Sequence, residues 1–339
     1  MRSASLVFLL SLLLFNQRTS FSQTIKNTEV KFLLDSCITV MRCNSVNASQ
    51  IQWPALKTNV YKMASDLNSP YELGNVMRYL LKSLKDNHGA FFYKDSMFKW
   101  EPKQPSISDS IKNEWNKRSG IKRMILSNNV GYLRVPSMPG DSKSVFDEKA
   151  QSLNDSLCYL LERNVKGIVL DLRINGGGAM FPMILGLKQL LQSGKLGSFD
   201  TGKQKEEEWL VSGDNFLVDT TVLTTIHQRC TINAGRLPVV ILTSNATASS
   251  GEFLIMAFKG RKNIVLIGTP TNGLITVNNG FQINDSTFMN LSVGYGKDRN
   301  GNVYRTAIKP DISIKSPDSF NDINNDRKVK AAIKWINSR

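Results

Sequence analysis

Apolar residues follow a helical spacing through the first part of the chain. They recur in this way over the stretch 25–84, for example in 76–81. We therefore expect a helical N-terminal domain over 24–95. The next segment, 96–125, is polar and contains prolines and serines, which predicts a connector with one short helix near 111–115.

A different pattern begins after the connector. Short runs rich in β-branched residues alternate with stretches of helical spacing, which is typical of a layered α/β domain. The expected strands are 130–135, 165–172, 239–242 and 264–267, and the expected helices are 146–163, 182–191 and 252–259. The two central strands are apolar on both faces, so we expect helices on both sides of the sheet.

The part of the chain after residue 193 contains a polar excursion and several turn signals. The segment 194–236 is polar with short strand-like pieces, and we expect it to form a cap within a core domain over 126–316. Asn-Gly pairs, which favour the tight turns of antiparallel β-hairpins, occur at 272–273, 279–280 and 300–301. We expect C-terminal β-hairpins there and a terminal helix within 317–339.

The N-terminus has the layout of a secretory signal peptide. A charged start, Met1-Arg2, precedes the apolar stretch 6–15 and the small and polar residues 19–23. A membrane anchor is the alternative, but a spanning helix needs roughly 20 apolar residues. We expect removal of 1–23, export to the periplasm or the outside of the cell, and no stable membrane anchor afterwards.

Lysine and arginine outnumber acidic residues by 43 to 28, which gives a net charge of +15. These basic residues are spread along the chain, without the basic helix or the basic-aromatic segments of nucleic-acid-binding modules. We therefore expect a basic solvated surface and no nucleic-acid partner. The sequence does not predict an oligomeric state.

The chain has four cysteines, no C-x-x-C pair and two histidines, so we expect no metal site. No organic cofactor is expected either. Export permits disulfides, and buried free thiols are an equal alternative.

Ser249 is a candidate nucleophile. In the segment 237–252 an apolar strand ends in small residues and continues directly into a helix. A serine at such a junction lies where backbone N–H groups converge. The alternative is that Ser249 serves only as a helix N-cap, a common role of serine.

A glycine-rich turn follows a second apolar strand at 167–178. Consecutive glycines allow backbone amides to approach a ligand, as an oxyanion hole or a phosphate site requires. The turn has neither the lysine and hydroxyl residue of a P-loop nor the G-x-G-x-x-G spacing, which argues against nucleotide binding.

His88 is the candidate general base, because a serine nucleophile needs a base whose pKa lies near the working pH. It closes the helical segment in the sequence Asp86-Asn87-His88-Gly89. His227 is the competing histidine, within the polar excursion. Considered singly, either could be a surface or capping residue.

Taken together, these pieces resemble the tail-specific or C-terminal processing serine peptidases, a family with a crotonase-like α/β core. The motifs that carry the resemblance lie at 86–88, 130–133, 170–177, 247–252, 268–271 and 308–311. Each is loose, but their order and spacing span most of the chain. The resemblance implies a crotonase-like layered core with an N-terminal helical domain, and a peptide or unfolded protein segment as substrate.

The resemblance also assigns roles to residues. Ser249 becomes the nucleophile, with Ser250 and the turn at Gly176 and Gly177 supplying oxyanion amides. Asn175 is expected to fix that turn. Asp171 and Arg173 are expected to hold structure at the strand end.

Two departures separate the chain from the pattern of the family. Leu274 occupies the place of the lysine in a serine-lysine dyad, so the sequence is more similar to the branch in which a histidine, here His88, is the base. Tricorn-like members orient this histidine with a glutamate, and 298–309 contains none; Asp298 or Tyr304 could take its place. A non-catalytic binder of peptides or apolar ligands and an esterase on the same serine remain alternatives.

Overall fold

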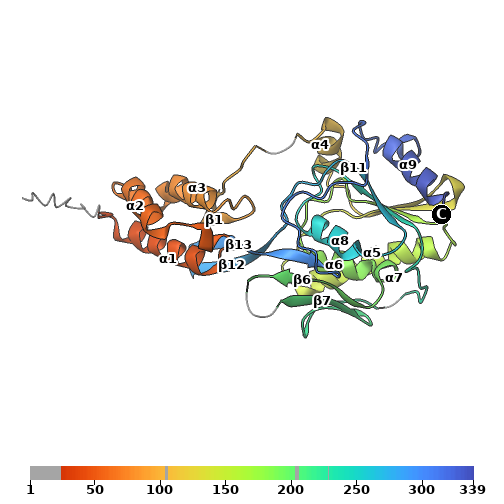
Figure 1. Cartoon of the computed structure of the whole chain (residues 1–339), viewed down its shortest axis with the longest axis horizontal. Helices are drawn as coiled ribbons and strands as arrows, with labels where there is room; N and C mark the ends of the chain where they lie inside the picture. The colour runs from red at the N-terminus through yellow and green to blue at the C-terminus, as the bar shows by residue number, and fades with distance from the viewer. Residues whose placement is uncertain (1–23, 104–105, 203–205, 228) are drawn as a thin grey trace, which may run out of the picture.

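The computed structural model describes residues 24–103, 106–202, 206–227 and 229–339. The predicted signal peptide, 1–23, lies outside the described residues. Figure 1 shows a small N-terminal lobe and a larger lobe, which are bridged by the strands β12 and β13. Within the described part of the chain, no helix has both the length and the apolar composition needed to cross a bilayer.

Helices α1 (Thr28–Asn44), α2 (Trp53–Ala64) and α3 (Gly74–Ser83) form most of the small lobe. The apolar side of α1 is buried, and the side chain of Asn27 caps its start by accepting from two backbone amides. The lobe also contains β1 (Ala90–Tyr93) and β2 (Ser96–Phe98), two strands that were not among the expected elements. The apolar core explains them, because it includes Met289 and Leu291 of β13 beside Phe91.

The large lobe contains a sheet with the strand order β14-β11-β10-β5-β4-β3. Its strands are β3 (Lys122–Leu126), β4 (Val130–Arg134), β5 (Ile168–Asp171), β10 (Val239–Thr243), β11 (Ile264–Gly268) and β14 (Ile312–Ser313). All neighbours run parallel except β3 with β4.

Alternate residues of the central strands enter different hydrophobic clusters. Ile168 and Leu170 of β5 pack in one cluster and Val169 in another. The first cluster contains residues of α5 (Lys143–Leu161), α6 (Met180–Gly186), α7 (Lys188–Leu191) and α8 (Ser250–Phe258), and the second contains residues of α4 (Asp109–Asn116) and α9 (Arg327–Ile336). The predicted burial of both sheet faces is thus confirmed.

A second sheet has the order β2-β1-β13-β6-β7-β8-β9, with β12 also paired to β13. Its further strands are β6 (Gly194–Asp200), β7 (Glu207–Ser212), β8 (Asn215–Val218), β9 (Thr221–Thr225), β12 (Thr276–Asn284) and β13 (Thr287–Asp298). The segment expected to be a cap therefore contributes an antiparallel sheet. Strand β13 pairs with β1 through Asn290 and with β6 through Tyr295, so it belongs to both lobes.

The hairpin prediction at 279–280 is wrong. Asn279 and Gly280 lie within β12, opposite Leu291 and Asn290, and the chain turns between Asn284 and Thr287. Gly280 is needed there for space, since a Cβ atom would lie 2.5 Å from the ring of Phe288. The pair at 300–301 does lie in a turn, where Gly301 has a φ of 83°.

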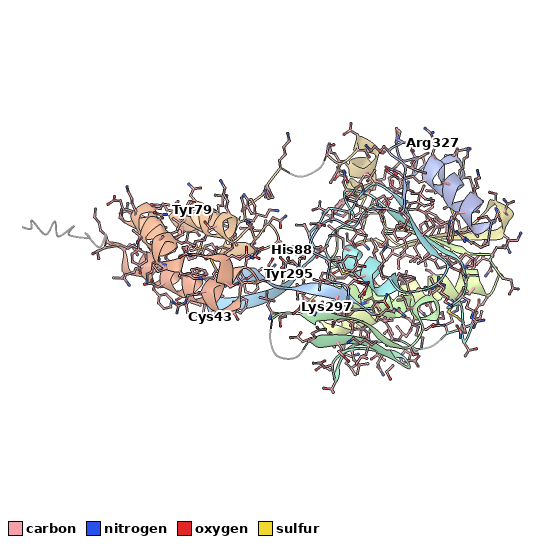
Figure 2. The ribbon with its side chains drawn as sticks, viewed as in Figure 1. Cys43, Tyr79, His88, Tyr295, Lys297 and Arg327 are labelled. Atoms are coloured by element: carbon pink, nitrogen blue, oxygen red, sulfur yellow. A yellow bond between two sulfur atoms is a disulfide. The ribbon has the colours of Figure 1, made fainter. Side chains whose placement is uncertain are left out.

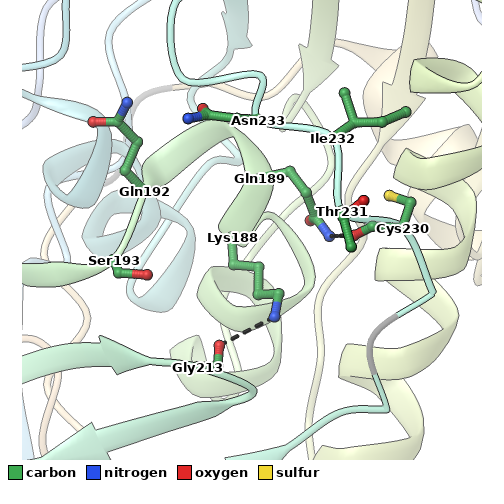
Figure 3. Close-up of a pocket in the computed structure, with 9 residues that line it drawn as sticks. All are labelled: Lys188, Gln189, Gln192, Ser193, Gly213, Cys230, Thr231, Ile232 and Asn233. Atoms are coloured by element: carbon green, nitrogen blue, oxygen red, sulfur yellow. Dashed lines mark hydrogen bonds between the residues drawn. The ribbon is translucent and has the colours of Figure 1, made fainter.

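A disulfide joins Cys158 of α5 to Cys230, whereas Cys37 and Cys43 are free thiols. Figure 3 shows Cys230 beside a polar hollow that includes Gln189 and Lys188, whose ammonium donates to the carbonyl oxygen of Gly213 at 3.1 Å. The disulfide thus ties the segment after β9 to the helical layer.

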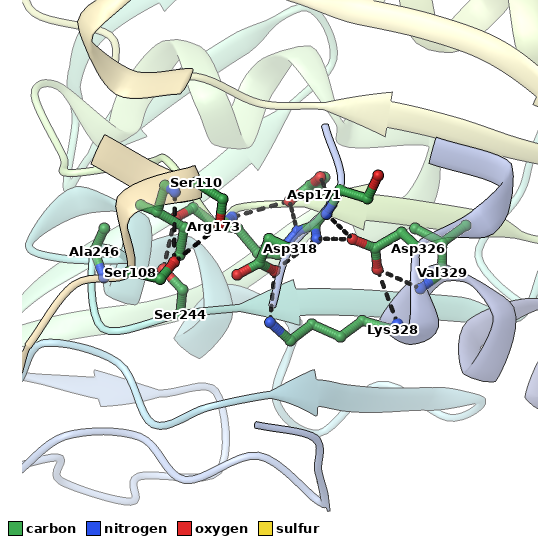
Figure 4. Close-up of polar contacts among 12 residues, drawn as sticks. Ser108, Ser110, Asp171, Arg173, Ser244, Ala246, Asp318, Asp326, Lys328 and Val329 are labelled. Atoms are coloured by element: carbon green, nitrogen blue, oxygen red, sulfur yellow. Dashed lines mark hydrogen bonds and ion pairs between the residues drawn. The ribbon is translucent and has the colours of Figure 1, made fainter. Parts of the chain in front are cut away.

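A buried ion cluster fastens the C-terminal segment to the end of β5 (Figure 4). Arg173 donates to both carboxylate oxygens of Asp171, at 2.9 and 2.6 Å. Its Nη1 also donates to Asp318 and Asp326, each at 2.7 Å. Lys328 adds a second cation, 2.5 Å from Asp318. The cluster thus joins the end of β5 to the segment that contains Asp318 and Asp326.

We expect Arg173→Leu to lower the free energy of unfolding by about 3–5 kcal/mol, because it leaves buried carboxylates without their main counter-ion. Urea denaturation measures the change. The exposed pair of Lys26 and Asp66 provides a control, and Lys26→Ala should leave the unfolding midpoint unchanged. Equal midpoints for the wild type and Arg173→Leu would contradict this account of the cluster.

Candidate active site

Ser249 lies at the sharp turn between β10 and α8. It is the N-cap of α8, with φ 52° and ψ −122°. A residue other than glycine adopts such a positive φ only where its surroundings enforce it. The turn places the side chain at the N-terminus of a buried helix, next to its free amide groups.

Glu252 enforces this turn from within α8. One carboxylate oxygen accepts the amide of Ser249 at 2.9 Å, and the other accepts the Thr271 hydroxyl at 2.5 Å and the Gly273 amide at 2.9 Å. Burial raises the pKa of Glu252 to about 7, and these donors oppose the rise. Glu252 is a site residue without an expected role, although a glutamate three residues after a capping serine is a recognisable signal in the sequence.

The glycine-rich turn packs against the serine turn. Asn175 is fully buried and donates to the carbonyl oxygens of Val135 and Pro136, each at 3.1 Å. Its side-chain oxygen accepts the Gly177 amide at 3.0 Å, and its carbonyl oxygen accepts the Ala248 amide at 2.9 Å. Asn175 therefore holds the two turns together.

Gly177 lies directly beside Ser249. It has a φ of 109°, and an added Cβ atom would lie 2.8 Å from the Ser249 Cβ and 3.2 Å from its Oγ. The close approach of these turns thus depends on glycine at this position.

The amides near Ser249 differ in their availability. The Gly176 amide donates to the Ser137 hydroxyl at 2.8 Å, and the Gly177 amide donates to Asn175. Within the described residues, the amides of Ser250 and Gly178 have no protein acceptor, while the Ser250 hydroxyl donates to the Gly178 carbonyl oxygen. Of the amides expected to form an oxyanion hole, those of Gly176 and Gly177 thus already have protein acceptors, whereas those of Ser250 and the neighbouring Gly178 have none among the described residues.

His88 comes from the turn between α3 and β1, at the junction of the two lobes (Figure 2). Its Nδ1 lies 3.0 Å from the Thr276 Oγ1, and its backbone amide donates to Asp86 at 3.1 Å. Burial lowers the pKa of His88 below 6.5, and the charge of Asp86 and a hydrogen bond to the backbone of Thr276 oppose this shift. A buried imidazole of lowered pKa is neutral at pH 7, as a general base must be.

Ser249 and His88 line the same pocket, which has a volume of about 500 Å³. No hydrogen bond joins their side chains directly, and such contacts commonly tighten only when substrate binds. The rest of the lining is mostly apolar, with the aromatic residues Phe146, Phe181, Phe199 and Phe253. The hollow shown in Figure 3 shares no lining residue with this pocket.

Asp298 and Tyr304 are placed elsewhere. The Tyr304 hydroxyl donates to Asp298 at 3.0 Å, and Asp298 also accepts the amides of Asn300 and Asn302. They form the turn after β13, and neither lines the pocket with Ser249 and His88. Within the described part of the chain, no three histidine, cysteine, aspartate or glutamate side chains come together as a metal site.

The chain belongs to peptidase family S41, whose model matches residues 129–314. Its relatives include carboxy-terminal processing proteases, of which the chain spans less than half of the length. The nisin-resistance protein of Lactococcus lactis is 29% identical over 216 residues, and the carboxy-terminal processing protease CtpA of Bacillus subtilis is 26% identical over 214 residues. Each match covers 63% of this chain, 62% of the nisin-resistance protein and 41% of CtpA.

Solved structures share the fold. A lipoprotein from Streptococcus agalactiae superposes with a TM-score of 0.69 at 22% identity, over 93% of this chain and 98% of that one. A putative peptidase from Parabacteroides merdae gives a TM-score of 0.63 at 18% identity, over 91% and 97% of the two chains.

We expect Gly177→Ala to slow the labelling of Ser249 by a fluorophosphonate probe on the order of 10²-fold, because the new methyl group displaces the serine. Mass spectrometry of the labelled peptide measures the rate. Gly301→Ala is the matched control, since Gly301 also has a positive φ but no atom within 4 Å of an added Cβ. Equal labelling of the two variants would show that crowding at Gly177 does not position Ser249.

Proposed function

We propose that this protein hydrolyses peptide bonds through an acyl-enzyme, with Ser249 as the nucleophile and His88 as the general base. The observation that carries the proposal is that two turns from different lobes present a serine and a neutral histidine to one pocket. A nucleophile, a base and free backbone amides in one pocket are the parts that acyl transfer requires.

In the first step, the His88 Nε2 takes the proton of the Ser249 hydroxyl as Oγ attacks the substrate carbonyl. The amides of Ser250 and Gly178 stabilise the negative oxygen of the tetrahedral intermediate. His88 then gives the proton to the leaving amine as the C–N bond breaks. Water attacks the acyl-enzyme with His88 again as base, which releases the acid and restores the serine.

The substrate is a peptide or an unfolded segment, and its preferred side chain next to the scissile bond is large and apolar. The aromatic lining of the pocket supports this choice, because burial of an apolar group there removes it from water. The described lining of the pocket contains no carboxylate, lysine or arginine, which also favours an apolar side chain over a charged one.

The mature protein is exported to the periplasm or beyond the cell. The Cys158–Cys230 disulfide supports this location, because such bonds persist in oxidising compartments. We further propose that the parallel sheet with its flanking helices is a crotonase-like core.

A fluorophosphonate probe tests the proposal. We expect modification of Ser249 in the wild type, none in Ser249→Ala, and slower modification in His88→Ala, together with cleavage of apolar peptides. Absence of labelling in the folded wild type would favour a non-catalytic binder. Rapid turnover of small acyl esters without peptide cleavage would favour an esterase.

The pH dependence gives a second test. Because only neutral His88 accepts a proton and burial lowers its pKa, labelling should stay fast at pH 6.5 and decline only at lower pH. Labelling rates between pH 4 and 8, over the range in which circular dichroism shows a folded protein, measure the profile. An acid limb centred above pH 6.5 would contradict the assignment of His88 as the base.

A further inference from the structure

A chain of hydrogen bonds leads away from the imidazole of His88. Its Nδ1 lies 3.0 Å from the Thr276 Oγ1, which lies 2.8 Å from the Ser292 Oγ. The Ser292 hydroxyl donates to the Asp86 carboxylate at 2.7 Å. Thr276 and Ser292 come from β12 and β13, whereas Asp86 precedes His88 by two residues.

The carboxylate sets the direction of every bond in this chain. An ionised carboxylate only accepts, so Ser292 donates to Asp86. The Ser292 oxygen then accepts the Thr276 hydroxyl, whose own oxygen accepts the N–H at Nδ1 of His88. The amide oxygen of Asn278, 3.2 Å from the Ser292 Oγ, is a longer and uncharged alternative acceptor.

Local backbone geometry builds this arrangement. The register between β12 and β13 shifts at a β-bulge between Val277 and Asn278, beside the hydroxyls. Bulges of this kind redirect side chains near active sites. Asp86 is buried and also accepts the Gly89 amide at 2.7 Å and the Ser292 amide at 2.9 Å, so it locks the His88 turn onto β13.

We propose that Thr276 and Ser292 are positioning residues, which with Asp86 take the place of a third triad residue and hold His88 in the Nδ1–H tautomer. This inference rests on the proposed function and deepens it. The Nδ1–H tautomer leaves Nε2 unprotonated, and Nε2 is the atom that must accept the Ser249 proton. No proton leaves Nδ1 at any step, because the hydroxyls only orient the ring and stabilise the imidazolium.

The surroundings of His88 contain no other described group for the role of orienting its imidazole. Asp86 is the charged residue that acts on the pKa of His88, and the described pocket lining adds no other ionisable group. Asp298 and Tyr304, the alternatives suggested by the sequence, bond to each other. Within the described residues, Thr276 is the side chain that contacts a ring nitrogen of His88.

NMR of the full chain tests the tautomer without any measurement of activity. The sequence has two histidines, so a His227→Gln variant assigns the signals of the ¹⁵N-labelled imidazole rings. At pH 8 we expect His88 to show the protonated nitrogen at Nδ1. Protonation at Nε2 in the folded wild type would overturn the proposal, whatever the catalytic activity.

Substitution of Thr276 tests its effect on the chemistry. Thr276→Val keeps the shape but removes the hydroxyl, and we expect fluorophosphonate labelling and peptide cleavage to slow on the order of 10- to 100-fold. The acid limb of the labelling rate should move to lower pH, because the variant lacks the hydroxyl oxygen that accepts the Nδ1–H and so favours the imidazolium form of His88. Thr276→Ser should restore both properties, and Ser292→Ala should show a smaller loss of the same kind.

Thr221→Val, at an exposed position of β9, is the matched control and should behave as the wild type. Unchanged labelling and an unchanged acid limb in folded Thr276→Val would refute the positioning role of Thr276 and Ser292. The proposed roles of Ser249 and His88 would be unaffected. A wild type that never labels would instead refute the proposed function. If Thr276→Val unfolds, the NMR measurement of the His88 tautomer in the wild type still tests the proposal.

Discussion

Pairing of β13 with strands of both lobes is the constraint that brings the candidate site together. Its first residues pair with β1 and bury Met289 among the N-terminal helices, and its last residues pair with β6 of the large lobe. His88 lies two residues before β1, so the register between β1 and β13 sets the place of the imidazole. Between these two pairings, Leu291, Ser292 and Gly294 pair with β12, which follows β13 across the junction of the lobes.

On the other side of the pocket, buried polar contacts hold Ser249 in its unfavourable backbone conformation. Asn175 joins the serine turn to the glycine turn, and Glu252 accepts the serine amide. The ion cluster around Arg173 holds the end of β5, from which the glycine turn begins. These groups cost free energy to bury, and their removal would leave partners unsatisfied, so each makes the turn specific more than it makes the fold stable.

Local pattern sufficed for some features and failed for others. The apolar strands around Val169 and Val240 and the serine at a strand-to-helix junction are evident from the sequence because their causes are local. The turn prediction at Asn279-Gly280 is wrong because these residues pair with Leu291 and Asn290 of β13, and such pairing is not evident from the dipeptide. The contact between Thr276 and His88 joins residues 188 positions apart, and only the pairing of β13 brings them together. Because this separation in sequence hides Thr276 as a partner of His88, the sequence pointed instead to Asp298 and Tyr304 as the residues that orient the histidine.

The electrostatic character of the site follows from the separation between His88 and its nearest carboxylate. A carboxylate bonded directly to the imidazole would raise the pKa of His88, which would protonate it at moderately acidic pH. Here two neutral hydroxyls intervene, and burial lowers the pKa below 6.5. In the proposed mechanism His88 is therefore neutral down to a pH below 6.5, but its imidazolium form is less stabilised than it would be beside a carboxylate. The proposed mechanism therefore assigns more of the transition-state stabilisation to the amides of Ser250 and Gly178 and to the fixed position of Ser249.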